Sequence, residues 1–227
     1  MSADRSPLVR LDGRLARSER SRRAVVVALL DLLQEGNVRP TASQIAQRAG
    51  VSLRSVFQHF ESIETLFAAA ADLQMERLAP LFVPIPAGGA LADRIATLVA
   101  RRSRLLEAIT PVRRASLRVE PFSQEVRTRL EGARSRGRAE VERVFAPELD
   151  ARPQAERREV AAALAAAASW SVWENLRRHQ GLSVERARKV VTLMLAALLG
   201  AEAGAARRRR SPRAPGAPQG GGEPSAA

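Results

Sequence analysis

Cysteine and tyrosine are both absent from this 227-residue chain, and aromatic residues make up only 4% of it. Without cysteine, disulfide bonds, thiolate metal ligands and cysteine nucleophiles are excluded. With so few aromatic residues, the core must be built mainly from Leu, Val, Ile and Ala, which favours helices. No segment shows the sustained two-residue alternation of a strand, so we predict an all-α fold without a sheet.

Catalytic and metal-binding patterns are also missing. The only histidines, His59 and His179, have no Asp, Glu or His partners at metal-ligand spacing. The sequence contains no P-loop, no dinucleotide-binding fingerprint and no Gly-x-Ser-x-Gly motif. We therefore predict no metal, no cofactor and no enzymatic activity.

Long apolar runs are lacking as well. The most apolar run, VVTLMLAALLGA, is shorter than the roughly 20 residues that cross a bilayer. The polar N-terminal stretch shows no secretory signal. We expect a cytoplasmic protein that does not enter membranes.

Positive charge is abundant. The formal net charge is +13 and the isoelectric point is about 11.6, so the chain should be attracted to a polyanion. Nucleic acid is the first candidate, and an anionic membrane surface is the rival. Part of the excess lies in the C-terminal run RRRRSPR, so arginine-rich tails could carry much of it.

Breaks in the helical pattern divide the chain. We predict a flexible basic arm at 1–16, a three-helix head at 17–67, a linking helix at 62–81, a larger helical body at 82–206 and a disordered basic tail at 207–227. About nine helices are expected in all. Beyond the linking helix, they are expected at about 90–109, 112–118, 122–146, 153–180 and 183–205, with breaks at Pro111, Glu120–Pro121, Pro147 and Gly181.

The stretch from Thr41 to Phe67 contains the start and stop signals of two short helices around a tight turn. Thr41 and Gln44 form the pattern of a capping box, and Gly50 permits the left-handed backbone that a turn needs. Ser52 is placed to cap the second helix. This arrangement is typical of a helix-turn-helix.

The second of these helices is expected to have two sides. The apolar side comprises Leu53, Val56, Phe57 and Phe60. The polar side comprises Arg54, Ser55, Gln58 and His59. Arginine pairs with guanine and glutamine with adenine in the major groove, although an ordinary amphipathic helix facing water would show the same pattern.

The whole segment IAQRAGVSLRSVFQHFES resembles the DNA-binding signature of TetR/AcrR-family transcriptional regulators. The resemblance covers about residues 18–68 and implies that the chain binds double-stranded DNA. It implies that Thr41 and Ser52 hold helix starts near phosphates, and that Arg54, Ser55 and Gln58 read bases. His59 matches a position near the DNA backbone, or is a surface histidine without a contact.

Two positions depart from the family pattern. Phe57 stands where a tyrosine hydroxyl usually contacts a phosphate, and Ile63 stands where a lysine is common. Phosphate contacts supply much of the affinity for DNA. We expect the N-terminal arginines to make up the deficit, namely Arg17, Arg20, Arg22 and Arg23.

The last helix of the body is apolar nearly all the way round, which requires cover on every side. Its own bundle and a second copy of the chain would supply that cover, and the family resemblance also implies a homodimer. Burial within one chain is the alternative. The expected contributors to a dimer interface are Val190, Met194, Ala197 and Leu198.

The resemblance further implies a pocket for a small-molecule effector among the middle helices. The candidate lining residues are Leu106, Phe122, Trp170, Trp173 and Asn175. Polar anchors would come from Glu107, Arg114 or His179, although each aromatic residue could equally belong to the core. The sequence does not name the effector.

These expectations combine into a homodimeric TetR-like transcriptional regulator, a repressor that an unknown small ligand releases from a near-palindromic operator. Two alternatives stay open. One is a basic protein that binds DNA or membrane surfaces without sequence preference. The other is a ligand-binding or enzymatic helical dimer with a vestigial DNA head.

Overall fold

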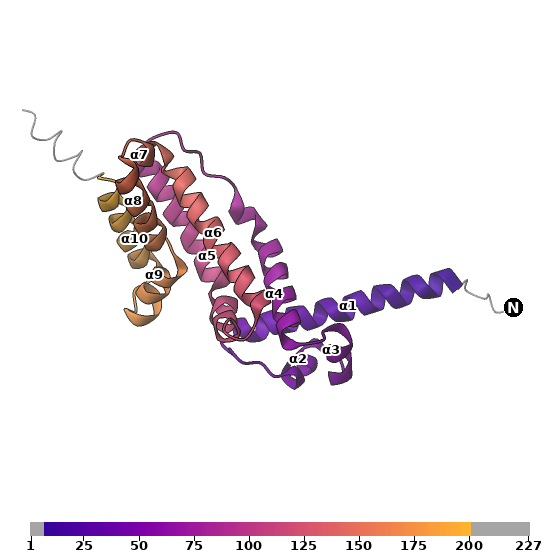
Figure 1. The fold of residues 1–227 in the computed structure, drawn as a ribbon. Helices are drawn as coiled ribbons and strands as arrows, with labels where there is room; N and C mark the ends of the chain where they lie inside the picture. The colour runs from indigo at the N-terminus through magenta and orange to yellow at the C-terminus, as the bar shows by residue number, and fades with distance from the viewer. Residues whose placement is uncertain (1–6, 201–227) are drawn as a thin grey trace, which may run out of the picture.

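The computed structural model describes residues 7–200, and its ribbon shows a small head beside a longer helical body (Figure 1). The all-α prediction is confirmed, since residues 7–200 form helices and no strand. None of these helices is both long and apolar enough to cross a membrane. The helices are α1 (Pro7–Gln34), α2 (Ala42–Ala49), α3 (Leu53–His59), α4 (Ile63–Leu78), α5 (Leu91–Val119), α6 (Gln124–Val144), α7 (Ala146–Asp150), α8 (Gln154–Ala167), α9 (Trp170–Glu174) and α10 (Val184–Leu198), with a 3₁₀ turn at Ala79–Phe82 and a π-helical turn at Asn175–His179.

Two apolar clusters hold the chain together. The head cluster is built on an i, i+4 stripe of α1, in which Val25, Leu29 and Leu33 are fully buried. Ile45 of α2 and Phe60, which follows α3, pack onto the same stripe. The body cluster comprises apolar residues of α5 to α10. The small head is therefore anchored on one long helix, which positions α2 and α3 at its surface.

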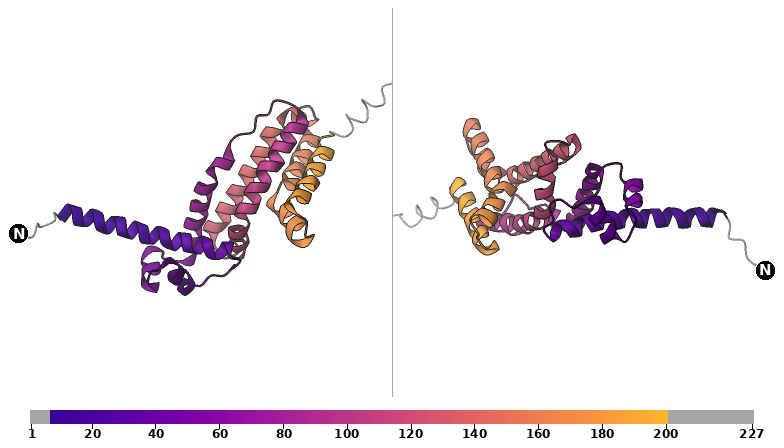
Figure 2. Two further views of the ribbon diagram at one scale, coloured as in Figure 1. Left: turned by 180° about the vertical axis from the view of Figure 1, so that it is seen from behind. Right: turned by 90° about the horizontal axis from the view of Figure 1, so that it is seen from below.

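Helix α1 is longer than expected. It begins at Pro7, whereas the sequence led us to place a flexible arm at 1–16. Proline suits a first helical position because its φ is preset and its missing N–H is not needed there. The first turns of α1 extend away from the rest of the molecule (Figure 2). Residues 1–6 and the basic tail at 207–227 lie outside the described range.

Helix α5 runs through Pro111, where we predicted a break. A proline inside a helix removes one hydrogen bond and usually ends or kinks the helix. Here side chains bond to carbonyl groups just before the proline. Thr110 Oγ1 donates to the Leu106 carbonyl, and the buried Gln74 of α4 donates to the Ala108 carbonyl at 2.8 Å. The bond from Gln74 before Pro111 and a bond from Arg114 to Glu174 of α9 beyond it are tertiary contacts that hold α5 in one helix.

The predicted helix at 153–180 is in fact three pieces. Helix α8 ends at Ala167, and Ser169 caps α9 by accepting a hydrogen bond from the Val172 N–H at 3.3 Å. The π-helical turn follows directly and ends near Gly181, which has a φ of 63°. Ser169, a helix cap inside an alanine-rich run, divides the predicted helix and was the local signal for this break.

Candidate nucleic-acid interface

The turn between α2 and α3 is fixed by hydrogen bonds at both helix starts. Thr41 Oγ1 accepts from the Gln44 N–H at 3.2 Å, and Gln44 Oε1 accepts from the Thr41 N–H at 2.9 Å. Gly50 ends α2 with a φ of 66°. Ser52 Oγ accepts from the Ser55 N–H at 3.1 Å and starts α3. The predicted capping box and serine cap are both confirmed.

The sides of α3 differ from those expected. Leu53 is 46% exposed and Phe57 is 59% exposed, so neither belongs to the apolar side that packs on the head. Only Val56 within α3, and Phe60 at its end, are buried. A helix of seven residues offers too little length for four core positions, and the wheel alone could not show which apolar residues meet α1 and α2.

Arg54 and Gln58 are exposed, as predicted for base readers. Ser55 and His59 are partly buried. The Ser55 hydroxyl lies 2.9 Å from the Ser52 hydroxyl, so it already has a partner at the helix start. The polar groups that α3 presents most fully are therefore those of Arg54 and Gln58.

Exposed arginines of α1 lie next to the head, and one of them is beside α3. Arg17, Arg20, Arg22 and Arg23 are all exposed along α1. The guanidinium of Arg22 lies 5.3 Å from the centre of the Phe60 ring, at the end of α3. This cation–π contact places the positive charge of Arg22 beside the end of α3.

The family comparison bears directly on this head. Residues 26–70, which contain α2, the turn, α3 and the start of α4, match the family described as bacterial regulatory proteins, tetR family.

The head of this chain is a TetR-family domain.

The TetR-type fold extends over the body as well. A TetR-family transcriptional regulator from Streptomyces coelicolor is 22% identical, with a TM-score of 0.61 over 84% of this chain and 88% of that one. A transcriptional regulator from Rhodococcus sp. Rha1 is 20% identical, with a TM-score of 0.61 over 79% of this chain and 96% of that one. None of the curated proteins compared with the chain matches it.

The predicted effector-pocket residues do not come together in this TetR-type body. Leu106 and Trp173 line a cavity of about 10 Å³, which is far below the roughly 300–1,000 Å³ of small-molecule sites. Phe122 is 87% exposed in the turn before α6, and Asn175 is exposed and bonded to Gln180. Neither residue lines this cavity, and the effector pocket remains a prediction. Trp170 donates instead to Thr110 Oγ1 at 3.0 Å.

Two of the polar anchors expected in the pocket, Glu107 and Arg114, instead bond to α9 and to the π-helical turn that follows it. Glu107 of α5 accepts from Trp173 Nε1 at 2.7 Å and from Arg177 Nε at 2.9 Å. About two turns further along α5, Arg114 donates to Glu174 at 2.8 Å. These bonds tie α9 and the π-helical turn to α5 on either side of Pro111.

We expect Glu107 to make this junction sensitive to acid. Burial alone would raise the pKa of Glu107, but hydrogen bonds from Arg177 and Trp173 lower it below its ordinary value. A carboxylate whose pKa is lowered in the folded state stabilises the fold at any pH above its ordinary, unfolded-state pKa. This stability is lost as the pH falls through the folded-state pKa. Both tryptophans lie in α9 and tyrosine is absent, so intrinsic fluorescence reports on this junction.

The measurement is an acid titration of tryptophan emission. A step is expected below about pH 4.3, the ordinary glutamate value, and Glu107→Gln should remove it. Glu35→Gln is the matched control, because the pKa of Glu35 is also lowered, by a hydrogen bond from Arg48, but Glu35 lies in the head. A step that persists in Glu107→Gln would assign it to another group.

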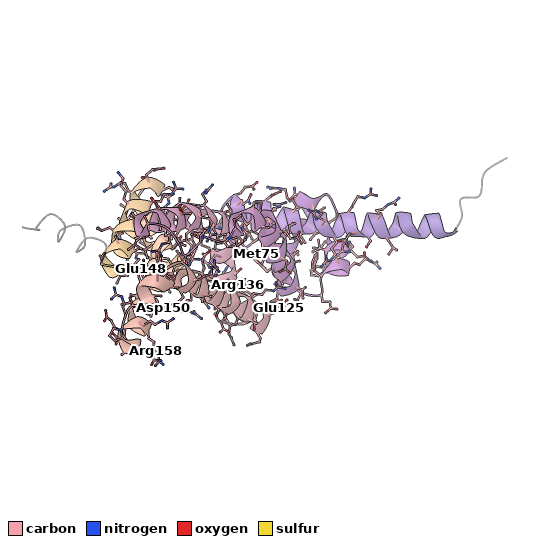
Figure 3. The ribbon with its side chains drawn as sticks, turned by 90° about the horizontal axis from the view of Figure 1, so that it is seen from above. Met75, Glu125, Arg136, Glu148, Asp150 and Arg158 are labelled. Atoms are coloured by element: carbon pink, nitrogen blue, oxygen red, sulfur yellow. The ribbon has the colours of Figure 1, made fainter. Side chains whose placement is uncertain are left out.

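A larger hollow lies elsewhere in the body. An open groove of about 340 Å³ runs between α6, α7 and α8, lined by Arg138, Glu142, Leu149, Gln154, Arg157, Arg158, Ala161 and Ala162. Arg157 pairs with Asp150 at 2.9 Å, and Figure 3 shows Asp150 and Arg158 on the same side of the body. The sequence did not indicate this groove, because its residues come from three helices and share no motif.

The outer face of α10 carries an exposed leucine, Leu193, that the predicted dimer interface did not include. Val190, Met194 and Leu198 are partly buried against the body's own core. Ala197 is exposed, and Leu193, one turn before it, is 56% exposed. The dimer residues thus remain a prediction, to which the structure adds Leu193. Its i, i+4 spacing to Ala197 was the available signal.

Proposed function

We propose that this TetR-family protein is a homodimeric, sequence-specific DNA-binding transcriptional repressor. The observation that carries the proposal is the exposed face of α3, where Arg54 and Gln58 stand on a capped helix-turn-helix that matches the tetR family. Arginine and glutamine side chains form bidentate contacts with guanine and adenine. The exposed arginines of α1 beside this face suit the phosphates that flank a major groove.

The dimer would place two copies of α3 in successive major grooves. Such half-sites lie about 34 Å apart, one helical turn of DNA, so a near-palindromic operator is expected. The face of α10 that carries Leu193 and Ala197 supports the pairing of two copies, because exposed apolar side chains of this kind gain by burial in a partner.

An effector would act through α5. A ligand shifts an equilibrium only if it binds one conformation more tightly than the other. The links from Glu107 and Arg114 to α9, and from Gln74 of α4 to the Ala108 carbonyl, join the body to the head at Pro111. A ligand that separates α9 from α5 would therefore change the position of α4 and the spacing of the two heads.

The test is selection of binding sites from random duplexes, followed by affinity measurement on the enriched site. We expect a near-palindromic site, and a loss of about 30- to 25,000-fold in affinity for Arg54→Ala, because a bidentate base contact is worth about 1–3 kcal/mol and the dimer loses two of them. Arg158→Ala, an exposed arginine on α8, is the control and should bind normally.

Other outcomes favour the alternatives. If no site is enriched, and Arg54→Ala and Arg158→Ala lose affinity equally, the protein binds DNA through its overall charge. If neither the wild type nor the variants bind duplexes at physiological salt, the head is vestigial.

A further inference from the structure

The reading helix presents apolar as well as polar side chains. Leu53 and Phe57 are 46% and 59% exposed, and they lie one turn apart on α3. At 3.6 residues per turn, the exposed arc runs in the order Leu53, Phe57, Arg54, Gln58. Phe57 and Arg54 therefore share the centre of the face, and the apolar pair continues directly into the polar pair.

Large apolar groups at the centre of an interaction face call for an apolar partner. The floor of the major groove offers one such group, the 5-methyl of thymine, which apolar side chains contact in specific complexes. A duplex suits this face better than a protein partner does, because the same arc carries Arg54 and because α1, whose Arg22 lies beside the end of α3, carries further exposed arginines. Phosphates would balance that charge.

We propose that Leu53 and Phe57 read thymine methyl groups, so that each half-site of the operator requires thymine beside the bases contacted by Arg54 and Gln58. The inference rests on the proposed DNA-binding function and adds part of its specificity. Phe57 has no hydroxyl to donate to a phosphate, so its ring is available for this contact. Phe57 would then contribute to the choice of DNA sequence, whereas a tyrosine at this position would bind the phosphate backbone of the DNA.

The experiment replaces each thymine of the enriched duplex, one at a time, with deoxyuridine, which lacks only the methyl group. At one or two positions per half-site, the affinity of the wild type should fall about fourfold, the worth of one buried methyl-sized group. In Phe57→Ala or Leu53→Ala the deoxyuridine effect at the corresponding position should vanish. Both side chains are largely exposed, so these variants should fold, and circular dichroism checks this.

The outcomes separate this inference from the proposed function. If a site is enriched but deoxyuridine binds as tightly as thymine at every position, the thymine proposal fails and the DNA-binding function stands. If the deoxyuridine effect persists unchanged in both Phe57→Ala and Leu53→Ala, other residues read the methyl groups and the proposal also fails. If no site is enriched, the proposed function fails and takes this inference with it.

Discussion

Replacing Arg94 with methionine is expected to lower the free energy of unfolding by about 3–5 kcal/mol, the cost of breaking a buried ion pair from one side. Arg94 of α5 is only 6% exposed. Its guanidinium donates to the Val144 carbonyl at the end of α6 and to both carboxylate oxygens of Glu148 in α7. Methionine fills a similar length but leaves that carbonyl and that carboxylate without their donor.

The loss should appear in urea denaturation as a lower midpoint with an unchanged slope. The melting temperature should fall by about 6–20 °C in a chain of this size. The double variant Arg94→Met, Glu148→Met should recover much of the loss, because it removes the unpaired charge as well.

A matched control is Arg157→Met, since Arg157 and Asp150 form an exposed pair at 2.9 Å. Exposed pairs contribute about 0–1 kcal/mol. An Arg94→Met variant as stable as Arg157→Met would show that the Arg94 contacts add no net stability.

Leu193→Glu is expected to convert the proposed dimer into monomers. In a twofold interface each substitution occurs twice, so two carboxylates would replace two apolar contacts in a single change. Like charges opposed across an interface cost several kcal/mol. Because two linked half-site contacts bind far more tightly than one, operator affinity should fall by about 10²–10⁴-fold. Sedimentation velocity measures the mass, and fluorescence anisotropy on the enriched duplex measures the affinity.

Phe122→Glu provides the control. Phe122 is more exposed than Leu193, at 87% against 56%, but lies in the turn between α5 and α6 rather than on α10. This variant should remain dimeric and bind DNA normally. If the Leu193→Glu variant is still a dimer, the dimer interface does not lie on this face of α10.

The head was the most predictable part of the molecule, because its signals are local. The capping box of Thr41 and Gln44, the glycine turn at Gly50 and the cap at Ser52 each depend on neighbours within a few residues. Such hydrogen bonds form in almost any tertiary context, so the sequence predicts them well.

The errors have tertiary causes. Whether Leu53 and Phe57 are buried depends on how α3 packs on α1 and α2. A helical wheel gives only the positions of residues around one helix and cannot show this packing. Pro111 continues a helix because α4 and α9 bond to its surroundings, and these segments are distant in sequence. The pocket residues remain a prediction, but the sequence could not show that Phe122 is exposed whereas Trp173 is buried.

Helix α5 belongs to both apolar clusters, and Pro111 lies where it passes from one to the other. Ile95, Leu98 and Leu106 pack in the body, whereas Val112 and Ala115, beyond the proline, pack in the head. A fragment that ends before α5 would leave part of the head's core open to water. We therefore expect the head and the body to unfold together, because the core of the head is completed by a helix that begins at the far end of the molecule (Figure 1).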